Sequence, residues 1–148
     1  MYTVQRRTPA SPERVWEVLA DGWTYPLWVV GASRMRAVSA DWPAVGAALH
    51  HSFGTWPALL DDDTQVLEVE PGHRLRLEAK GRPVGRAVVE ITLHPEGTGT
   101  RIEMVEDVAT GPGRTVPRPL RQGPVMVRNR ESLRRLTLVA ERRTEPEG

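Results

Sequence analysis

The sequence predicts an α+β fold in which a curved, seven-stranded antiparallel sheet wraps around one long C-terminal helix. Three observations support this prediction. Apolar residues recur with a period of two from Ser33 to Thr110, which is typical of strands. Short turns separate these segments, and short turns join antiparallel neighbours because a parallel crossover needs about a dozen residues or more. Val125 to Arg143 contains neither Gly nor Pro and is the only long helix that the pattern predicts.

One strand and two short helices are predicted before the main run of strands. Thr3 to Thr8 is short and β-prone, and a proline follows it directly. Ser11-Pro12-Glu13 is typical of a helix start, because it places an N-cap residue, a proline and an acid at successive positions. Trp23 to Val30 is predicted to form one or two further helical turns that end at Gly31.

The clearest strand runs from Arg74 to Lys80. Leu75, Leu77 and Ala79 share one face, and every residue between them is charged. Such a strand has one face on a core and the other in water. The same alternation returns in two later segments, whose inward positions are Ala87, Val89, Ile91, Leu93, Ile102 and Met104.

The C-terminal part is predicted to hold an irregular linker and then the long helix. Gly111 to Pro124 contains four Pro and three Gly, so we expect no regular element there. The apolar stripe of the helix is spaced three or four residues apart and consists of Val125, Met126, Asn129, Leu133, Leu136 and Ala140. One helix cannot fill a sheet of seven strands, so we expect a cavity between them near residues 126–133. Residues 1–143 are expected to be a single domain, and residues 144–148 a frayed tail.

Three features together resemble a known family. They are Ala10-Ser11-Pro12-Glu13-Arg14-Val15-Trp16 after the first strand, Asp63-Thr64 with Glu70-Pro71 in the run of hairpins, and the final helix. They are similar to the START/SRPBCC superfamily, most of all to its polyketide cyclase/dehydrase-like branch. The resemblance implies the helix-grip fold. It implies no single function, because members bind lipids, sterols, polyketides or hormones, or act as enzymes or co-chaperones.

Few polar residues are expected among the apolar ones that face the cavity. Extending the last alternation places Glu106 inward, either as an acid/base group or ligand anchor, or at the pocket mouth beside an arginine. Of His50 and His51 one faces inward, and His51 does so if Leu49 and Phe53 face the pocket. His51 is therefore the second catalytic candidate, by its ordinary pKa, or a hydrogen-bonded structural residue. Asn129 either binds a polar group of the ligand or bonds a strand or a water.

The remaining candidates are ligand contacts. In the resembling family the short segment with Tyr25 and Trp28 borders the pocket entrance; the alternative is that it packs onto the long helix. The full set of expected ligand-binding residues is Tyr25, Trp28, Phe53, Leu77, Val89, Ile91, Met104, Met126, Asn129 and Leu133.

Composition and motifs argue against several classes of partner. The net charge of +1 and the lack of a basic stripe argue against nucleic acid. There is no cysteine, and His50, His51, His73 and His94 are scattered, so we expect no metal. No phosphate loop, dinucleotide fingerprint or Gly-x-Ser-x-Gly motif occurs, and we expect no cofactor. No apolar stretch reaches the length of a membrane span, which makes a cytoplasmic protein the expectation. A homodimer is left open.

Three functions from different classes fit these expectations. The first is a binding protein for a small hydrophobic molecule, such as a lipid or polyketide, held in the internal cavity. The second is a polyketide aromatase or cyclase in which Glu106 or His51 moves protons in the same cavity. A third is a protein-interaction module that uses the outer face of the sheet. The sequence does not decide whether the protein is an enzyme.

Overall fold

The computed structural model describes residues 2–30, 32–53, 60–81, 85–110, 115 and 117–144. The predicted order of a strand, short helices, six strands and a long helix is confirmed. The elements are β1 (Tyr2–Thr8), α1 (Pro12–Ala20), the 3-10 helix η1 (Gly22–Thr24), α2 (Tyr25–Trp28), β2 (Ala32–Val38), β3 (Ala48–Phe53), β4 (Leu60–Glu70), β5 (Arg74–Gly81), β6 (Gly85–Glu96), β7 (Gly99–Thr110) and α3 (Arg118–Thr144).

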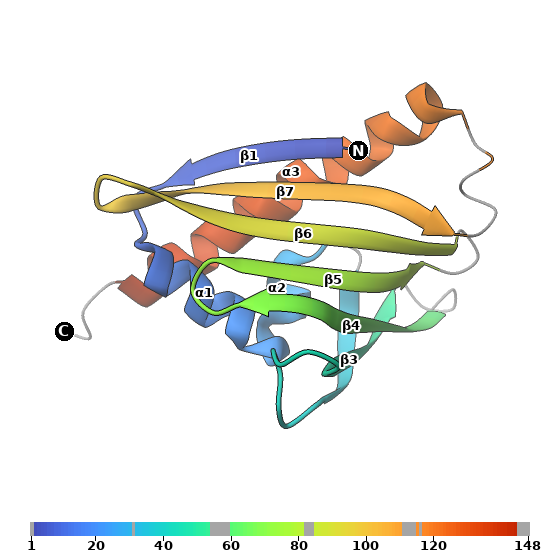
Figure 1. Ribbon diagram of the computed structural model, residues 1–148, viewed down its shortest axis with the longest axis horizontal. Coiled ribbons are helices and arrows are strands. Elements are labelled where there is room, and N and C mark those ends of the chain that lie inside the picture. Colours follow the sequence, from blue (N-terminus) through green and yellow to red (C-terminus); the bar gives the residue numbers. More distant parts are fainter. Residues whose placement is uncertain are drawn as a thin grey trace.

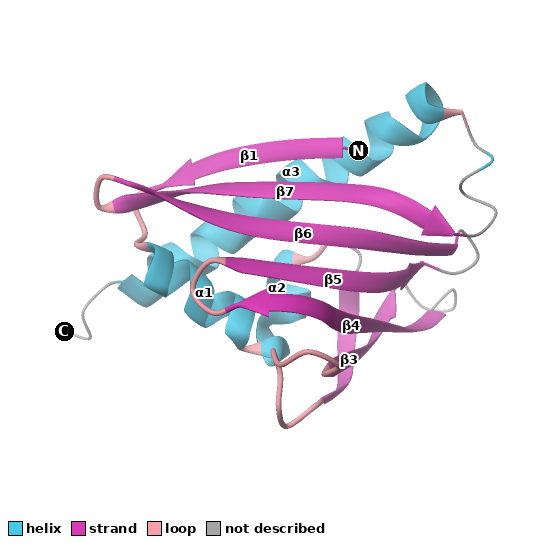
Figure 2. Ribbon diagram, in the orientation of Figure 1, coloured by secondary structure: helices cyan, strands magenta, loops and turns pink. Residues whose placement is uncertain are grey.

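The seven strands form one antiparallel sheet in the order β1-β7-β6-β5-β4-β3-β2. Sequential hairpins connect β2 to β7, and β1 pairs with β7 at one edge. In Figure 1 strands β1, β7, β6, β5 and β4 lie in front, and α3 passes behind them. Figure 2 shows β3 running crosswise to β5, β6 and β7, as expected of a strongly twisted and curved sheet. The helices therefore cover one face of the sheet and leave the other to solvent.

Helix α1 begins where the sequence predicts. The Ser11 hydroxyl accepts a hydrogen bond from the backbone N–H of Arg14 at 3.3 Å, and Pro12 is the first helical residue. This cap satisfies one of the N–H groups that a helix start leaves without a partner. The helix buries Val15 and Val18 against the core.

We expect Ser11→Ala to lower the free energy of unfolding by about 1 kcal/mol, because the capping hydrogen bond is lost while the helix stays otherwise intact. Urea unfolding followed by circular dichroism measures this difference. Unchanged stability would show that the Ser11 hydroxyl contributes nothing to the start of α1.

Helix α3 begins earlier than the sequence pattern predicts. It starts at Arg118, so the last seven residues of the predicted irregular linker, 118–124, are helical. Pro119 is the second helical residue, where a proline is tolerated because its missing N–H would have no partner inside the helix. Pro124 lies in the interior and removes one hydrogen bond without ending the helix. Residues 145–148 of the expected tail lie outside the described residues.

The core lies between the sheet and the helices, as the alternation predicts. Leu75, Leu77, Ile91, Ile102 and Met104 are buried on the strands. The buried α3 residues from the predicted stripe are Asn129, Leu133, Leu136 and Ala140, joined by Ser132 and Thr137. Val125 and Met126 are only partly buried. The predicted stripe is therefore correct in its central and C-terminal parts.

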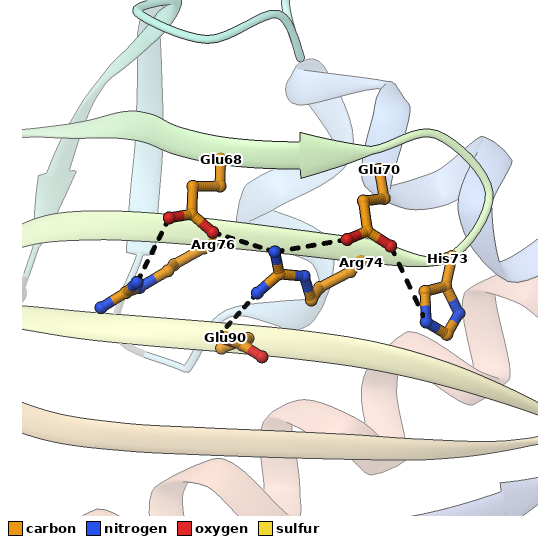
Figure 3. Close-up of polar contacts among 6 residues, drawn as sticks. All are labelled: Glu68, Glu70, His73, Arg74, Arg76 and Glu90. Atoms are coloured by element: carbon orange, nitrogen blue, oxygen red, sulfur yellow. Dashed lines mark hydrogen bonds and ion pairs between the residues drawn. The ribbon is translucent and has the colours of Figure 1, made fainter.

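The outer face of the sheet carries opposite charges in mutual contact. Arg74 lies 2.9 Å from Glu68, 3.4 Å from Glu70 and 3.4 Å from Glu90, and Figure 3 shows this network spread over neighbouring strands. Arg76 also contacts Glu68, at 3.5 Å. Exposed pairs of this kind contribute little to stability, because water and salt screen them. The network agrees with the predicted solvated face.

Candidate functional site

A cavity of about 70 Å³ lies between the sheet, α2 and α3. The sequence predicts a cavity near residues 126–133, and α3 contributes residues 128, 129 and 132 to the wall. The described residues that line it are Tyr25, Trp28, Val29, Val30, Thr64, Leu77, Ala79, Val89, Ile91, Met104, Glu106, Arg128, Asn129 and Ser132. Most of this wall is apolar. Most of its polar side chains form two groups, and Ser132 accepts a hydrogen bond from the backbone N–H of Val30 at 3.2 Å.

The first group is built around Glu106 on β7. Alternation from Ile102 and Met104 turns this carboxylate inward, and only 8% of its side chain is exposed. Arg128 Nη2 donates to Glu106 Oε2, and Asn129 Nδ2 donates to Glu106 Oε1 at 3.4 Å. Glu106 thus lines the cavity and also pairs with an arginine. Its role as an acid/base group or ligand anchor stays a prediction. We call Glu106, Arg128 and Asn129 the Glu106 cluster.

Arg128 was missed by the sequence analysis. It precedes Asn129 and lies at the border of the apolar stripe, so its position alone predicts a solvated residue. Its side chain is 42% exposed yet reaches the cavity wall, and it therefore extends from solvent into the site. An inward acid on the last strand was the available signal, since a buried carboxylate requires a partner.

The second group is centred on Thr64 of β4. Its hydroxyl lies 2.9 Å from His51 Nε2 and 3.4 Å from the Tyr25 hydroxyl. The ring centroids of Tyr25 and His51 are 5.1 Å apart. We call Tyr25, Thr64 and His51 the Tyr25 cluster. Thr64 was also missed, although its spacing of two from the buried Val66 predicts an inward side chain.

His51 faces inward but is not part of the cavity wall. It is fully buried, whereas His50 lies on the other face and bonds Asp63 at 2.7 Å. His51 is therefore the imidazole that points inward. The expectation that His51 faces the pocket is corrected in one respect, because Tyr25 and Thr64 line the cavity while His51 does not. The hydrogen bond to Thr64 connects His51 with the cavity wall.

Burial determines the protonation of the Tyr25 cluster. Burial, together with smaller effects of Arg36 and His50, lowers the pKa of His51 to about 4, against the opposing effect of Asp63. Burial also raises the pKa of Tyr25, against the hydrogen bond with Thr64 and the charge of Arg128. At neutral pH both groups are therefore uncharged, and the cluster offers hydrogen bonds rather than charge.

The low pKa of His51 predicts a pH-dependent stability. Between pH 6.5 and about 4 the unfolded chain binds a proton at this residue and the folded chain does not, so stability falls as the pH falls. We expect this residue to cost about 2 kcal/mol of unfolding free energy between pH 7 and pH 5. Urea unfolding at both pH values should show that His51→Gln removes this component, whereas His50→Gln keeps it. Equal pH dependence in wild type and His51→Gln would contradict the assignment.

The other predicted ligand contacts fall into three sets. Seven of them line the cavity: Tyr25, Trp28, Leu77, Val89, Ile91, Met104 and Asn129. Leu133 is buried in the core and Met126 packs against it, and neither is part of the cavity wall. The side chain of Phe53 lies outside the described residues. Contact of any of these residues with a ligand stays a prediction.

The chain matches one protein family and several solved structures. A model of the family described as "Polyketide cyclase / dehydrase and lipid transport" matches residues 2–141. The chain belongs to this family. The family match covers nearly the whole chain and confirms the resemblance found in the sequence. Among curated proteins, no sequence matches the chain significantly.

Solved structures share the fold of this polyketide cyclase/dehydrase family member. Protein MLL2253 from Mesorhizobium loti is 23% identical, with 97% of this chain and 98% of that chain covered and a TM-score of 0.69. SA2116 from Staphylococcus aureus is 12% identical, with coverage of 97% and 94% and a TM-score of 0.76. DynU16, a protein of the dynemicin biosynthetic locus, is 23% identical over 95% of this chain and 46% of its own, with a TM-score of 0.70. In the described ranges, no helix has both the length and the apolar character needed to cross a bilayer.

Proposed function

We propose that the protein binds a small hydrophobic molecule in the cavity between the sheet and α3. The observation that carries this proposal is the cavity itself, whose apolar wall is interrupted by two polar clusters. Sites for small molecules generally combine a concave, mostly apolar wall with a few placed polar groups. Membership of a family described by polyketide cyclisation and lipid transport supports the same class of ligand.

The size of the cavity limits the ligand that it can enclose without movement of side chains. Its volume of about 70 Å³ is about half that of an apolar cavity that accepts benzene, roughly 150 Å³. A larger ligand must therefore displace side chains at the mouth or leave part of itself outside. Arg128 is the side chain placed to move, because it joins α3 to β7 across the wall and is already partly in solvent.

Binding can be tested with N-phenyl-1-naphthylamine, an uncharged fluorescent probe of hydrophobic sites. We expect saturable binding that Val89→Phe weakens at least about tenfold, because the larger ring fills the cavity. Val88→Phe is the matched control, since the neighbouring residue on β6 points to the other face of the sheet. Absence of saturable binding, or equal loss in both variants, would contradict the proposal.

A second candidate function is the cyclisation of a poly-ketone chain in the same cavity. Glu106 favours it, because a carboxylate in the cavity wall can remove a proton from a carbon beside a carbonyl group. The uncharged Tyr25 hydroxyl can donate to that carbonyl oxygen while the new carbon–carbon bond forms. The likeness to DynU16 of the dynemicin locus is consistent with this chemistry and concerns the fold alone.

The two candidates differ in one measurement. If the protein is a cyclase, Glu106→Gln should abolish turnover of a poly-ketone substrate, and His51→Ala should reduce it through Thr64. Binding without turnover in the wild-type protein would favour the binding function. Turnover that survives in Glu106→Gln would exclude Glu106 as the base.

A further inference from the structure

The two polar clusters come from different strands of the cavity wall. The Glu106 cluster comes from β7 and α3, and the Tyr25 cluster comes from α2, β4 and β3. Strands β5 and β6 separate β4 from β7. Three strand intervals correspond to about 14 Å between the backbones of β4 and β7. A ligand that bonds both Glu106 and Thr64 must therefore extend across β5 and β6.

On the sheet side, the wall between the two clusters is apolar. Val89 on β6 is paired with Glu106, and Leu77 on β5 is paired with Val89. Ala79 on β5 is paired with Thr64, so it borders the Tyr25 cluster. All three line the cavity. The pattern along the sheet side of the wall is polar, apolar, polar.

The described cavity wall carries no net charge. The carboxylate of Glu106 is compensated by the guanidinium of Arg128, and the Tyr25 cluster is uncharged at neutral pH. A charged ligand would lose its hydration without meeting a free counter-charge, and burying a charge in this way is costly. A hydroxyl or carbonyl group meets suitable partners instead, because the carboxylate accepts, the guanidinium donates and the Tyr25 hydroxyl does either.

We propose that the ligand is an uncharged, mostly apolar molecule with a hydroxyl or carbonyl group at each of two opposite ends. One end bonds the Glu106 cluster and the other bonds Tyr25 or Thr64. Fatty acids and other carboxylates are excluded by the balanced charge of the wall. This inference rests on the proposed binding function and specifies its ligand class.

Four probes of one bicyclic framework test it by displacement of N-phenyl-1-naphthylamine: naphthalene, 2-naphthol, 2,6-dihydroxynaphthalene and 2-naphthoate. We expect the diol to bind about tenfold or more tighter than naphthalene, with 2-naphthol between them, since each buried hydrogen bond corresponds to a several-fold gain in affinity. We expect 2-naphthoate to bind more weakly than 2-naphthol.

The outcomes distinguish failure of the inferred ligand class from failure of the proposed binding function. Equal binding of the diol and 2-naphthol, or tighter binding of 2-naphthoate than 2-naphthol, would overturn the inference and leave the binding function standing. Binding of none of the four probes, nor of the fluorescent probe, would overturn the proposed function and the inference with it.

Two variants locate the polar end at the Tyr25 cluster. Thr64→Val should reduce the affinity for the diol about fivefold and leave naphthalene unaffected, because only a hydrogen bond is removed. Thr92→Val makes the same change on the outer face of β6 and should alter neither affinity. Tyr25→Phe provides a second test if Thr64→Val fails to fold. Equal losses for the diol and naphthalene in both Thr64→Val and Tyr25→Phe would overturn the assignment of this end.

Discussion

Replacing Leu136 by alanine is expected to lower the free energy of unfolding by about 3–4 kcal/mol. Leu136 is fully buried on α3, at the centre of the core between the helix and the sheet. Its truncation removes apolar contacts and leaves a void that the packed surroundings fill only in part. Because domains of this size are stable by roughly 5–15 kcal/mol, this one change removes a large share of the total.

Leu138→Ala is the matched control for this prediction. Leu138 lies two residues further along α3, on its solvent side, with 42% of its surface exposed. Its truncation should cost less than about 1 kcal/mol, since little burial is lost and alanine favours a helix as well as leucine does. Urea unfolding of both variants measures the difference. Similar losses would mean that α3 does not present Leu136 to the core.

Most of the fold could be predicted because its signals are local. Alternation on β5, such as Leu75 and Leu77, reports which face is buried without any knowledge of the partner strands. The same rule placed Glu106 inward, and the Ser11 cap placed the start of α1. The start of α3 was placed wrongly, because Pro119 and Pro124 were both taken as helix breakers, whereas the first turn tolerates Pro119 and the helix continues through Pro124.

The site could be predicted only in part, because its contacts join elements that are distant in the chain. Arg128 meets Glu106 only once α3 lies across β7, and no local pattern reports that placement. The sequence placed one of His50 and His51 inward without deciding between them. The separation of His51 from the cavity depends on Tyr25 and Thr64, which come from two other elements. Periodicity predicts the face on which a residue lies. It does not predict what covers that residue.

The ion pair in the cavity wall should respond asymmetrically to mutation. Arg128→Met is expected to lower the free energy of unfolding by about 3 kcal/mol, because it leaves a carboxylate that is 8% exposed without its charged partner. Glu106→Gln should cost only about 1 kcal/mol, since Arg128 is 42% exposed and can turn into solvent. Arg134→Met is the control on the same helix, where an exposed pair with Glu131 at 3.6 Å contributes less than about 1 kcal/mol.

A double variant tests whether the pair serves stability or binding. Replacing both partners of a buried pair by apolar groups is often neutral, so Arg128→Met combined with Glu106→Leu should recover most of the stability lost in Arg128→Met alone. Thermal or urea unfolding measures this recovery. If the double variant is as stable as the wild type but no longer prefers 2,6-dihydroxynaphthalene over naphthalene, the pair contributes to ligand recognition rather than to folding. If it is less stable than Arg128→Met, the pair is a structural contact and Glu106 loses its role as a ligand anchor.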